Sequence, residues 1–466
     1  MTIERPAAPV PALRHRGIST TRDVDALTLL TVYLVLLLAV PSNITITALG
    51  SLGRPALLWG VVLFVFWAAS RLQQHDDLGL PVRQPVRFAF ALLVVVALVS
   101  FAAALLRGQP ADQVSPAMTA LVRLVSWGGV LLLAVDGLTT MHDITRLVRR
   151  IAIGVGLLAA LGIAQALTGQ PIVDFWTQIP GLSGPDDLGL GERGGVVRSA
   201  GTAIHPLEYA TALNAALPLV IAVAVSNGFR RGAASARSSI LWWLPAALVA
   251  ASAIVGVSRS AIIGFALASL AMIPMLPRRY RLIVVIGGGS LAAGIIVAVP
   301  GLLGTTMSLF TGAGDDPSTQ SRISGLDRLT DFVSPSPLIG TGFGTFLPRY
   351  FIFDDQWVLM TVELGLLGVL AFAGIFAAAI WSALRARRLS REEDVSLLGY
   401  SLAVSLLVVA VLFVFFDGLS FPISAGMLFL LAGLCGATLT IGTADAAAER
   451  VASVHRTAAD PDDEGL

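Results

Sequence analysis

The sequence has little charge, a single cysteine and no lysine. Only 13% of its 466 residues are charged, whereas 55% are hydrophobic. This composition excludes an ordinary soluble protein. Cys435 lies inside an apolar run, which leaves neither a disulfide framework nor a thiol metal site. Every basic residue other than histidine is arginine, and the polar N-terminus is not followed by a small-residue cleavage site. We therefore expect an uncleaved first helix.

Long apolar runs dominate the rest of the chain. A helix needs roughly 20 apolar residues to cross the hydrocarbon core, and the backbone there has to bond to itself. The runs lie at 24–40, 55–70, 88–106, 117–135, 151–167, 207–226, 240–257, 261–276, 282–299, 356–384, 395–416 and 423–441. They predict an all-α, polytopic integral membrane protein with about 12 transmembrane helices.

Arginine clusters occur on alternate connecting segments, and the segments between them contain few arginines. Because positive charge marks the cytoplasmic side, both termini are expected in the cytoplasm. The loops 168–206 and 300–355 are then extracytoplasmic, and the second, between helices 9 and 10, is large. We expect a cytoplasmic tail at 1–23, a transmembrane domain at 24–442 and a disordered cytoplasmic tail at 443–466, which is rich in Ala, Asp and Glu.

Four of the scarce arginines on the outer side are candidate phosphate ligands. They are Arg198, Arg259, Arg322 and Arg328. A guanidinium group binds phosphate oxygens bidentately and stays charged at any working pH. Two other interpretations stay open. Arg259 can contact lipid headgroups, and Arg322 and Arg328 can belong to a solvated, salt-bridged loop helix.

Three residues are candidates for proton transfer at the outer side. His205 lies at a helix start, three residues before Glu208, and is the one histidine expected on that side, so a histidine metal site is not expected. Asp355 precedes an apolar helix, where it can also act as an N-cap. Glu363 follows two helical turns later, inside the membrane, and an intramembrane carboxylate suggests function. Arg123 is its possible partner.

A glycine-rich run occupies residues 340–344 of the large loop. It matches neither phosphate-loop pattern and follows no strand of a βαβ unit. We expect these glycines to let the backbone re-enter close to the helix bundle.

Four motifs in order carry a resemblance to a known family. They are Arg198 and Gly201 with His205-Pro206, then Ser258-Arg259-Ser260-Ala261, then Arg322 with 337–344, and finally Asp355-Gln356 with Leu359, Glu363, Gly365 and Gly368. Together they resemble the O-antigen ligase/O-antigen polymerase superfamily of polytopic, GT-C-like membrane glycosyltransferases, over residues 198–368. Each motif alone is weak, and the four in order are fairly specific.

The resemblance implies a transfer with inversion that needs no metal or other cofactor. A polyprenyl-diphosphate-linked oligosaccharide is the donor, a hydroxyl of a glycan or glycolipid is the acceptor, and nucleic acid plays no part. The reaction takes place at the outer face of a bacterial cytoplasmic membrane. Arg198, Arg259 and Arg322 would hold the diphosphate with help from Arg328. Asp355 would take the acceptor proton, and Glu363 or His205 could substitute for it.

One departure bears on the product. Ligases of this family have His, followed by Asn, Ser or Gln, where this chain has Asp355-Gln356. An acidic residue there resembles the polymerase branches. Rival interpretations are a peptidoglycan polymerase of the shape, elongation, division and sporulation type, a transporter or flippase of lipid-linked glycans, and a structural membrane subunit. Transporters carry polar residues at mid-membrane, whereas this chain concentrates them in two outer loops.

Overall fold

The computed structural model describes most of the chain. The described residues are 25–73, 83–185, 191–193, 196–230, 240–255, 258–282, 285–286, 289–290, 293, 317–390 and 392–459. The expected N-terminal tail at 1–23 and most of the expected span at 282–299 lie outside this part.

The described residues are mainly helical. The α-helices are α1 (Ala26–Ala39), α2 (Pro55–Gln73), α3 (Pro85–Leu106), α4 (Ala111–Gly137), α5 (Met141–Thr168), α6 (Pro206–Val225), α8 (Leu244–Val255), α9 (Arg259–Met272), α10 (Arg278–Leu282), α13 (Pro317–Val333), α14 (Gln356–Leu389), α15 (Glu393–Leu412) and α16 (Pro422–Ala459). Short 3-10 helices are η1 (Thr47–Leu52), η2 (Asp174–Gln178), η3 (Ile273–Met275) and η5 (Gly418–Ser420).

Two small antiparallel ladders lie in the connections. β1 (Thr45–Ile46) pairs with β2 (Leu182–Ser183), with Thr45 opposite Ser183. β3 (Gly191–Arg193) pairs with β4 (Val196–Arg198), with Gly191 opposite Arg198. The first ladder joins the segment after α1 to the expected outer loop 168–206.

Among the described residues, eight helices are long and apolar enough to cross a membrane: α2, α3, α4, α5, α6, α14, α15 and α16. Three shorter apolar helices start at Ala26, Leu244 and Arg259. Each of these helices coincides with an expected span. The all-α, multi-pass membrane architecture is therefore confirmed.

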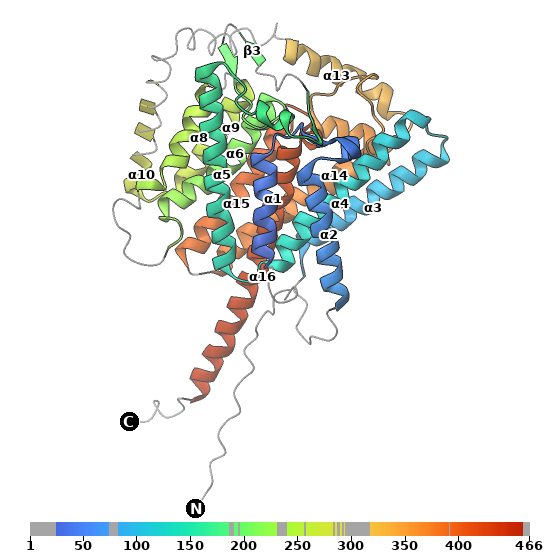
Figure 1. Ribbon diagram of the computed structural model, residues 1–466. Helices are drawn as coiled ribbons and strands as arrows, with labels where there is room; N and C mark the ends of the chain where they lie inside the picture. The colour runs from blue at the N-terminus through green and yellow to red at the C-terminus, as the bar shows by residue number, and fades with distance from the viewer. Residues whose placement is uncertain are drawn as a thin grey trace, which may run out of the picture.

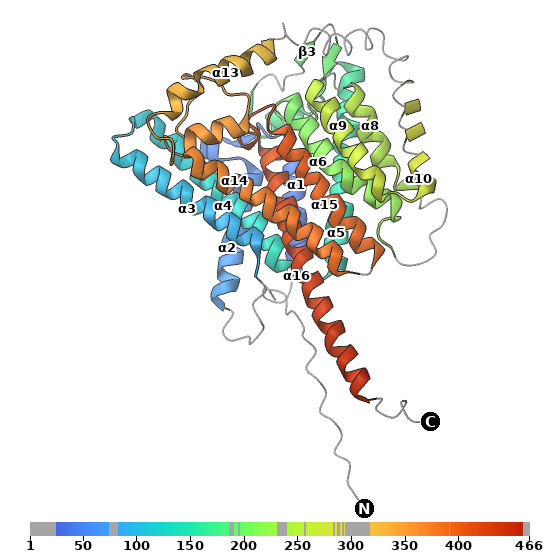
Figure 2. The same ribbon diagram turned by 180° about the vertical axis from the view of Figure 1, so that it is seen from behind.

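The two expected outer loops meet at one end of the helix bundle. α13 and β3 lie at the same end in both views, and the C-terminal part of α16 projects from the opposite end (Figures 1 and 2). The described parts of the two loops therefore lie on the same side of the bundle although a long stretch of sequence separates them.

α6 and α16 form the centre of the bundle, and almost all of their apolar residues are buried. α2 and α3 are much more exposed, as expected for helices that face lipid. Phe429 of α16 stacks on Trp127 of α4 with ring centroids 5.0 Å apart and meets Phe90 of α3 edge-on at 5.8 Å. These aromatic contacts join the central helix to the outer ones.

The C-terminal segment differs from the expectation. We expected disorder from Thr443, but α16 continues as a helix to Ala459. This segment is rich in alanine, which has the highest helix propensity and needs no apolar period to form a helix. Residues 460–466 lie outside the described part.

The long helix α14 is interrupted at Gly365, whose φ of 64° and ψ of -164° are not helical. The re-entrant segment, defined as residues 337–345, packs into this break and satisfies the backbone groups there. The N–H groups of Thr341 and Gly342 donate to the carbonyl oxygens of Val362 and Glu363 at 3.0 and 2.9 Å, and those of Leu366 and Leu367 donate to Pro337 and Leu338 at 2.9 and 3.1 Å. The expected re-entry of the glycine-rich run is confirmed.

Close backbone contact makes glycine necessary on both sides of this junction. A Cβ atom on Gly340 would lie 2.2 Å from the carbonyl oxygen of Glu363, and one on Gly365 would lie 2.4 Å from the carbonyl carbon of Leu338. Both residues also have positive φ, which side chains with a Cβ atom rarely adopt.

We predict that Gly365→Ala destabilises the protein by about 1–3 kcal/mol, the usual cost of a strained backbone residue, because the new methyl group also meets Leu338. Gly374→Ala is the matched control in the same helix, since nothing lies within 4 Å of a Cβ atom there. Thermal unfolding in detergent measures both variants. Equal melting temperatures would contradict a tightly packed junction.

Candidate functional site

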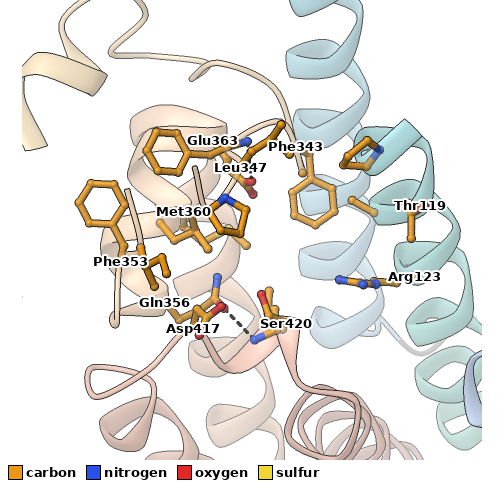
Figure 3. A pocket seen from close by; sticks show the side chains of 18 of the residues that line it. Thr119, Arg123, Phe343, Leu347, Phe353, Gln356, Met360, Glu363, Asp417 and Ser420 are labelled. Carbon is orange, nitrogen blue, oxygen red and sulfur yellow. Dashed lines mark hydrogen bonds between the residues drawn. The ribbon is translucent and has the colours of Figure 1, made fainter. Parts of the chain in front are cut away.

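A cavity of about 420 Å³ lies beside the re-entrant segment, and we call it the main cavity of the site. Helices α4 and α14, the loop 343–353 and the α15–α16 connection contribute its walls. Its polar and charged lining consists of Ser51, Ser115, Thr119, Arg123, Gln356, Glu363, Asp417 and Ser420, and its aromatic lining of Trp127, Phe343, Phe346, Phe351 and Phe353. Figure 3 shows the labelled side chains around this space. The combination of ionic groups, hydroxyls and rings can bind a polar ligand that also has apolar faces.

Glu363 lies at the break in α14 and is 6% exposed. Its Oε1 accepts a hydrogen bond from the N–H of Phe346 at 3.3 Å, and its carboxylate attracts Arg123 electrostatically. Arg123 projects from α4 into the same cavity (Figure 3). The partner proposed for Glu363 from the sequence is therefore its neighbour across the cavity.

Asp417 also lines the main cavity, from the short connection between α15 and α16. Burial and, to a lesser extent, the charge of Asp354 raise the pKa of Asp417 to about 6, against a hydrogen bond from Ser420. Gln356 holds the same connection in place. Its side-chain Oε1 accepts from the backbone N–H of Leu419 at 2.7 Å, and its backbone N–H donates to the carbonyl oxygen of Phe413 at 2.8 Å. Figure 3 labels Gln356 and Asp417 among the residues that line the cavity.

Asp355 is the N-cap of α14. Its Oδ1 accepts from the N–H groups of Trp357 and Val358 at 2.8 and 3.2 Å. Burial raises the pKa of Asp355, whereas these two hydrogen bonds and the charge of Arg322 oppose the rise. Both hydrogen bonds use Oδ1, so Oδ2 is the oxygen that can accept a proton from a substrate. The capping interpretation is confirmed, and it leaves the catalytic one open.

Arg322 extends from α13 toward Asp355. Its Nη2 donates to the carbonyl of Phe415 at 2.8 Å and its Nε to that of Asp354 at 3.4 Å, and its guanidinium lies 5.6 Å from the Phe415 ring centroid. Arg322, Asp354 and Asp355 line a small second cavity of about 30 Å³. Phe353 lines this cavity and the main one, so the two cavities adjoin at this residue.

His205 is the N-cap of α6, and its Nδ1 accepts from the N–H of Leu207 at 3.1 Å. Burial lowers the pKa of His205, and the charge of Arg198 lowers it further, while Asp354 opposes both. The neutral ring then carries its proton on Nε2. In this state His205 can donate a hydrogen bond from Nε2, and it has no free basic nitrogen.

Glu208, three residues after His205, has a structural role. It is fully buried and accepts three hydrogen bonds from three segments. The donors are Ser42 Oγ at 3.1 Å, the N–H of Ile204 at 2.8 Å and the N–H of Ile423 at 2.6 Å. Arg54 also interacts electrostatically with it. The carboxylate thus joins the segment after α1 to the first turns of α6 and α16.

The first two of the four family motifs, around Arg198 and around Arg259, meet at α6. Ser199, which follows Arg198, and Ser258, which precedes Arg259, line one cavity of about 10 Å³. Asn214 of α6 donates to the carbonyl of Ala261 at 2.9 Å. Arg259 is the first residue of α9 and is partly exposed.

Arg328 stands apart from the other candidates. It is exposed on α13 and lies 5.5 Å from the ring centroid of Phe351. It therefore fits a solvated face of the loop helix, as the alternative interpretation expected.

The sequence interpretation missed Asp417 and gave no role to Arg54. Burial lowers the pKa of Arg54, and Glu208 opposes the shift. Arg54 also repels Arg123. Asp417 could have been noticed as the one carboxylate within the apolar stretch 410–431. No group of three or more His, Cys, Asp or Glu residues that could hold a metal occurs in the described part of the chain.

Comparison with known proteins agrees with the motifs. Residues 244–373 match the family model of the O-antigen ligase family. This range contains Arg259, Arg322, Arg328, Asp355 and Glu363, whereas Arg198 and His205 precede it. A search of curated proteins finds no match. The match confirms the resemblance deduced from the motifs: residues 244–373 of this multi-pass membrane protein are similar to the O-antigen ligase family.

Proposed function

We propose that the protein is an inverting, metal-independent glycosyltransferase that moves a polyprenyl-diphosphate-linked glycan onto an acceptor hydroxyl. The site faces the outside of a bacterial cytoplasmic membrane, with both chain termini on the inside and about 12 spans between them. Polymerisation is favoured over ligation, because Asp355 stands where ligases of the family have histidine.

The convergence of the four motifs at one end of the bundle carries this proposal. Arg322 donates to the backbone carbonyl of Asp354 and acts electrostatically on Asp355. The charges of Asp354 and Arg198 both act on His205. The segments around Arg198 and Arg259 meet at α6. Arg322 and Arg198 thus act electrostatically on Asp355 and His205, which supports a site for the diphosphate of a membrane lipid at this end of the helices.

The proposed reaction uses these groups as follows. The oxygen of the acceptor hydroxyl attacks the anomeric carbon of the donor sugar from the face opposite the diphosphate. The bond from this carbon to the phosphate oxygen breaks, and the lipid diphosphate leaves. Oδ2 of Asp355 takes the acceptor proton, and Arg198, Arg259 and Arg322 stabilise the charge that develops on the leaving group.

The main cavity supports a role in binding sugar. Its carboxylates and hydroxyls can bond to sugar hydroxyls, and its rings can cover the apolar faces of a pyranose. Arg123 and Glu363 lie close enough to interact electrostatically. In our proposal this cavity holds the acceptor glycan, with its hydroxyl directed past segment 353–356 toward Asp355.

A transporter of lipid-linked glycans is the second candidate, because interrupted helices are typical of transporters and α14 is interrupted. The break in α14, however, is filled by the backbone of the re-entrant segment. This favours a static support for the site over a gate.

Product analysis tests the proposal. Purified protein in lipid, given a polyprenyl-diphosphate oligosaccharide, should release lipid diphosphate and form a ladder of longer lipid-linked chains. A single transfer onto an added glycolipid would make the protein a ligase. If labelled lipid crosses the bilayer and no glycosidic bond forms with any donor, the transporter interpretation holds.

We predict that Asp355→Asn lowers the rate of transfer by about 10²–10⁴, the usual contribution of a general base. Asparagine caps helices as well as aspartate does, so the fold should persist. Asp331→Asn, on the exposed face of α13, is the matched control and should leave activity intact.

The pH profile adds a second readout. The base works in its deprotonated form, so the rate falls as the pH falls through the pKa of Asp355. Because burial raises this pKa, the loss of rate should begin at a pH above the ordinary aspartate pKa of about 4. Retained activity in a well-folded Asp355→Asn protein would remove Asp355 as the base and make Glu363 the next candidate.

A further inference from the structure

A further cavity, of about 650 Å³, lies at the end of the bundle opposite α13. It is formed by the first turns of α5, the turn after α6 and the start of α15. Its lining includes His142, Arg146 and Arg149 from α5, Arg230 after α6, and Glu392 and Asp394 before and within α15. None of these residues belongs to the outer site.

Positive charge predominates on one wall of this cavity, which we call the basic wall (Arg146, Arg149 and Arg230). Arg149 is repelled by Arg230, Arg146 and Arg150. Its Nη1 donates to the carbonyl of Gly228 at 3.1 Å, which holds the guanidinium in place. Glu392 and Asp394 lie on the α15 side of the cavity, and two carboxylates do not balance the guanidinium groups.

An apolar groove of about 390 Å³ adjoins the basic wall, and Arg230 lines both spaces. The groove is formed by helix α5, by two residues before α8 and by α8 itself; its apolar lining is Ile153, Gly156, Leu157, Leu241, Trp242, Leu244, Pro245 and Leu248. Leu157 is 66% exposed and Leu241 is 60% exposed. The groove is therefore open toward the space that lipid chains occupy around the bundle.

The junction of groove and cavity is built by a left-handed turn. Asn227, Gly228 and Phe229 have φ values of 52°, 76° and 53°. A Cβ atom on Gly228 would lie 2.8 Å from the ring of Trp242, so glycine permits the turn to pack on this ring. Arg230 then lies with its guanidinium carbon 5.8 Å from the ring centroid of Trp242. Tryptophan with an adjacent arginine is typical of the depth of lipid headgroups.

We propose that the basic wall and the apolar groove together bind one anionic phospholipid of the inner leaflet. Its phosphate contacts Arg146, Arg149 and Arg230, and an acyl chain lies in the groove between α5 and α8. Charge complementarity identifies the headgroup, since basic pockets between transmembrane helices on the cytoplasmic side suit anionic lipids. The continuity of the two spaces through Arg230 favours a lipid over a soluble phosphate.

The experiment compares thermal unfolding and native mass spectra of the full chain in two lipids. Phosphatidylglycerol should raise the melting temperature above its value in phosphatidylcholine and should stay bound in the mass spectrum, because a ligand of the folded state stabilises it. The double variant Arg146→Gln/Arg230→Gln changes two exposed residues, so its melting temperature in phosphatidylcholine should match the wild type. In phosphatidylglycerol it should lose the stabilisation.

Two further variants separate this site from general effects. Arg385→Gln removes an exposed arginine at the same end of the bundle, on α14 and outside both spaces, and should keep the full shift. Leu244→Trp fills the groove and should reduce the shift while leaving the basic wall intact. Inorganic phosphate alone should not reproduce the rise in melting temperature that phosphatidylglycerol causes.

Three outcomes would overturn the proposal. They are a full phosphatidylglycerol shift in the double variant, an equal loss in Arg385→Gln, and an equal shift with inorganic phosphate. If the double variant fails to fold, Leu244→Trp decides, since an unchanged shift there excludes the groove. Glycan transfer is not part of this test, so its result is independent of the proposed function.

Discussion

The backbone hydrogen bonds around Gly365 are the constraint on which the outer site depends. A helix inside a membrane cannot leave its N–H and carbonyl groups unpaired, because no water is present to bond to them. Here the re-entrant segment supplies the partners, and the glycines at positions 340 and 365 allow the two backbones to touch. The loop that follows then lies against α4 and α14, and Glu363 reaches the main cavity from the break itself.

Two charged side chains hold the surrounding connections in place. Glu208 joins segments from three parts of the chain through its carboxylate, and Arg322 joins α13 to the residues before α14 and after α15. Burying a charge is unfavourable unless hydrogen bonds and opposite charge compensate it. Both groups meet this condition. They therefore help to position Asp355 and His205 at the ends of their helices.

The two ends of the bundle offer different chemistry. At one end, carboxylates, rings and a guanidinium group line a cavity, which suits a reaction between polar ligands. At the other end, arginines border an apolar groove that opens toward lipid, which suits a bound lipid that does not react. Helix α6 contributes to both ends, because His205 caps its start and Arg230 follows its end. One helix thus connects the proposed lipid site with the proposed active site.

The sequence by itself determined the class of the protein and the positions of most helices. Apolar runs of this length have no stable alternative to a helix in hydrocarbon, so each fully described run forms a helix, although α5 and α16 extend beyond the expected runs. Local chemistry also predicted the helix start at His205 and the N-cap at Asp355. It failed beyond Thr443, where alanine propensity, and not apolar period, decides the structure.

Only the tertiary structure decided that Arg123, Glu363 and Asp417 share a cavity, that Glu208 joins three segments through hydrogen bonds and that Arg230 lines two adjoining spaces. Those contacts join residues that are far apart in the chain, and no local pattern records which helix faces meet when the bundle packs.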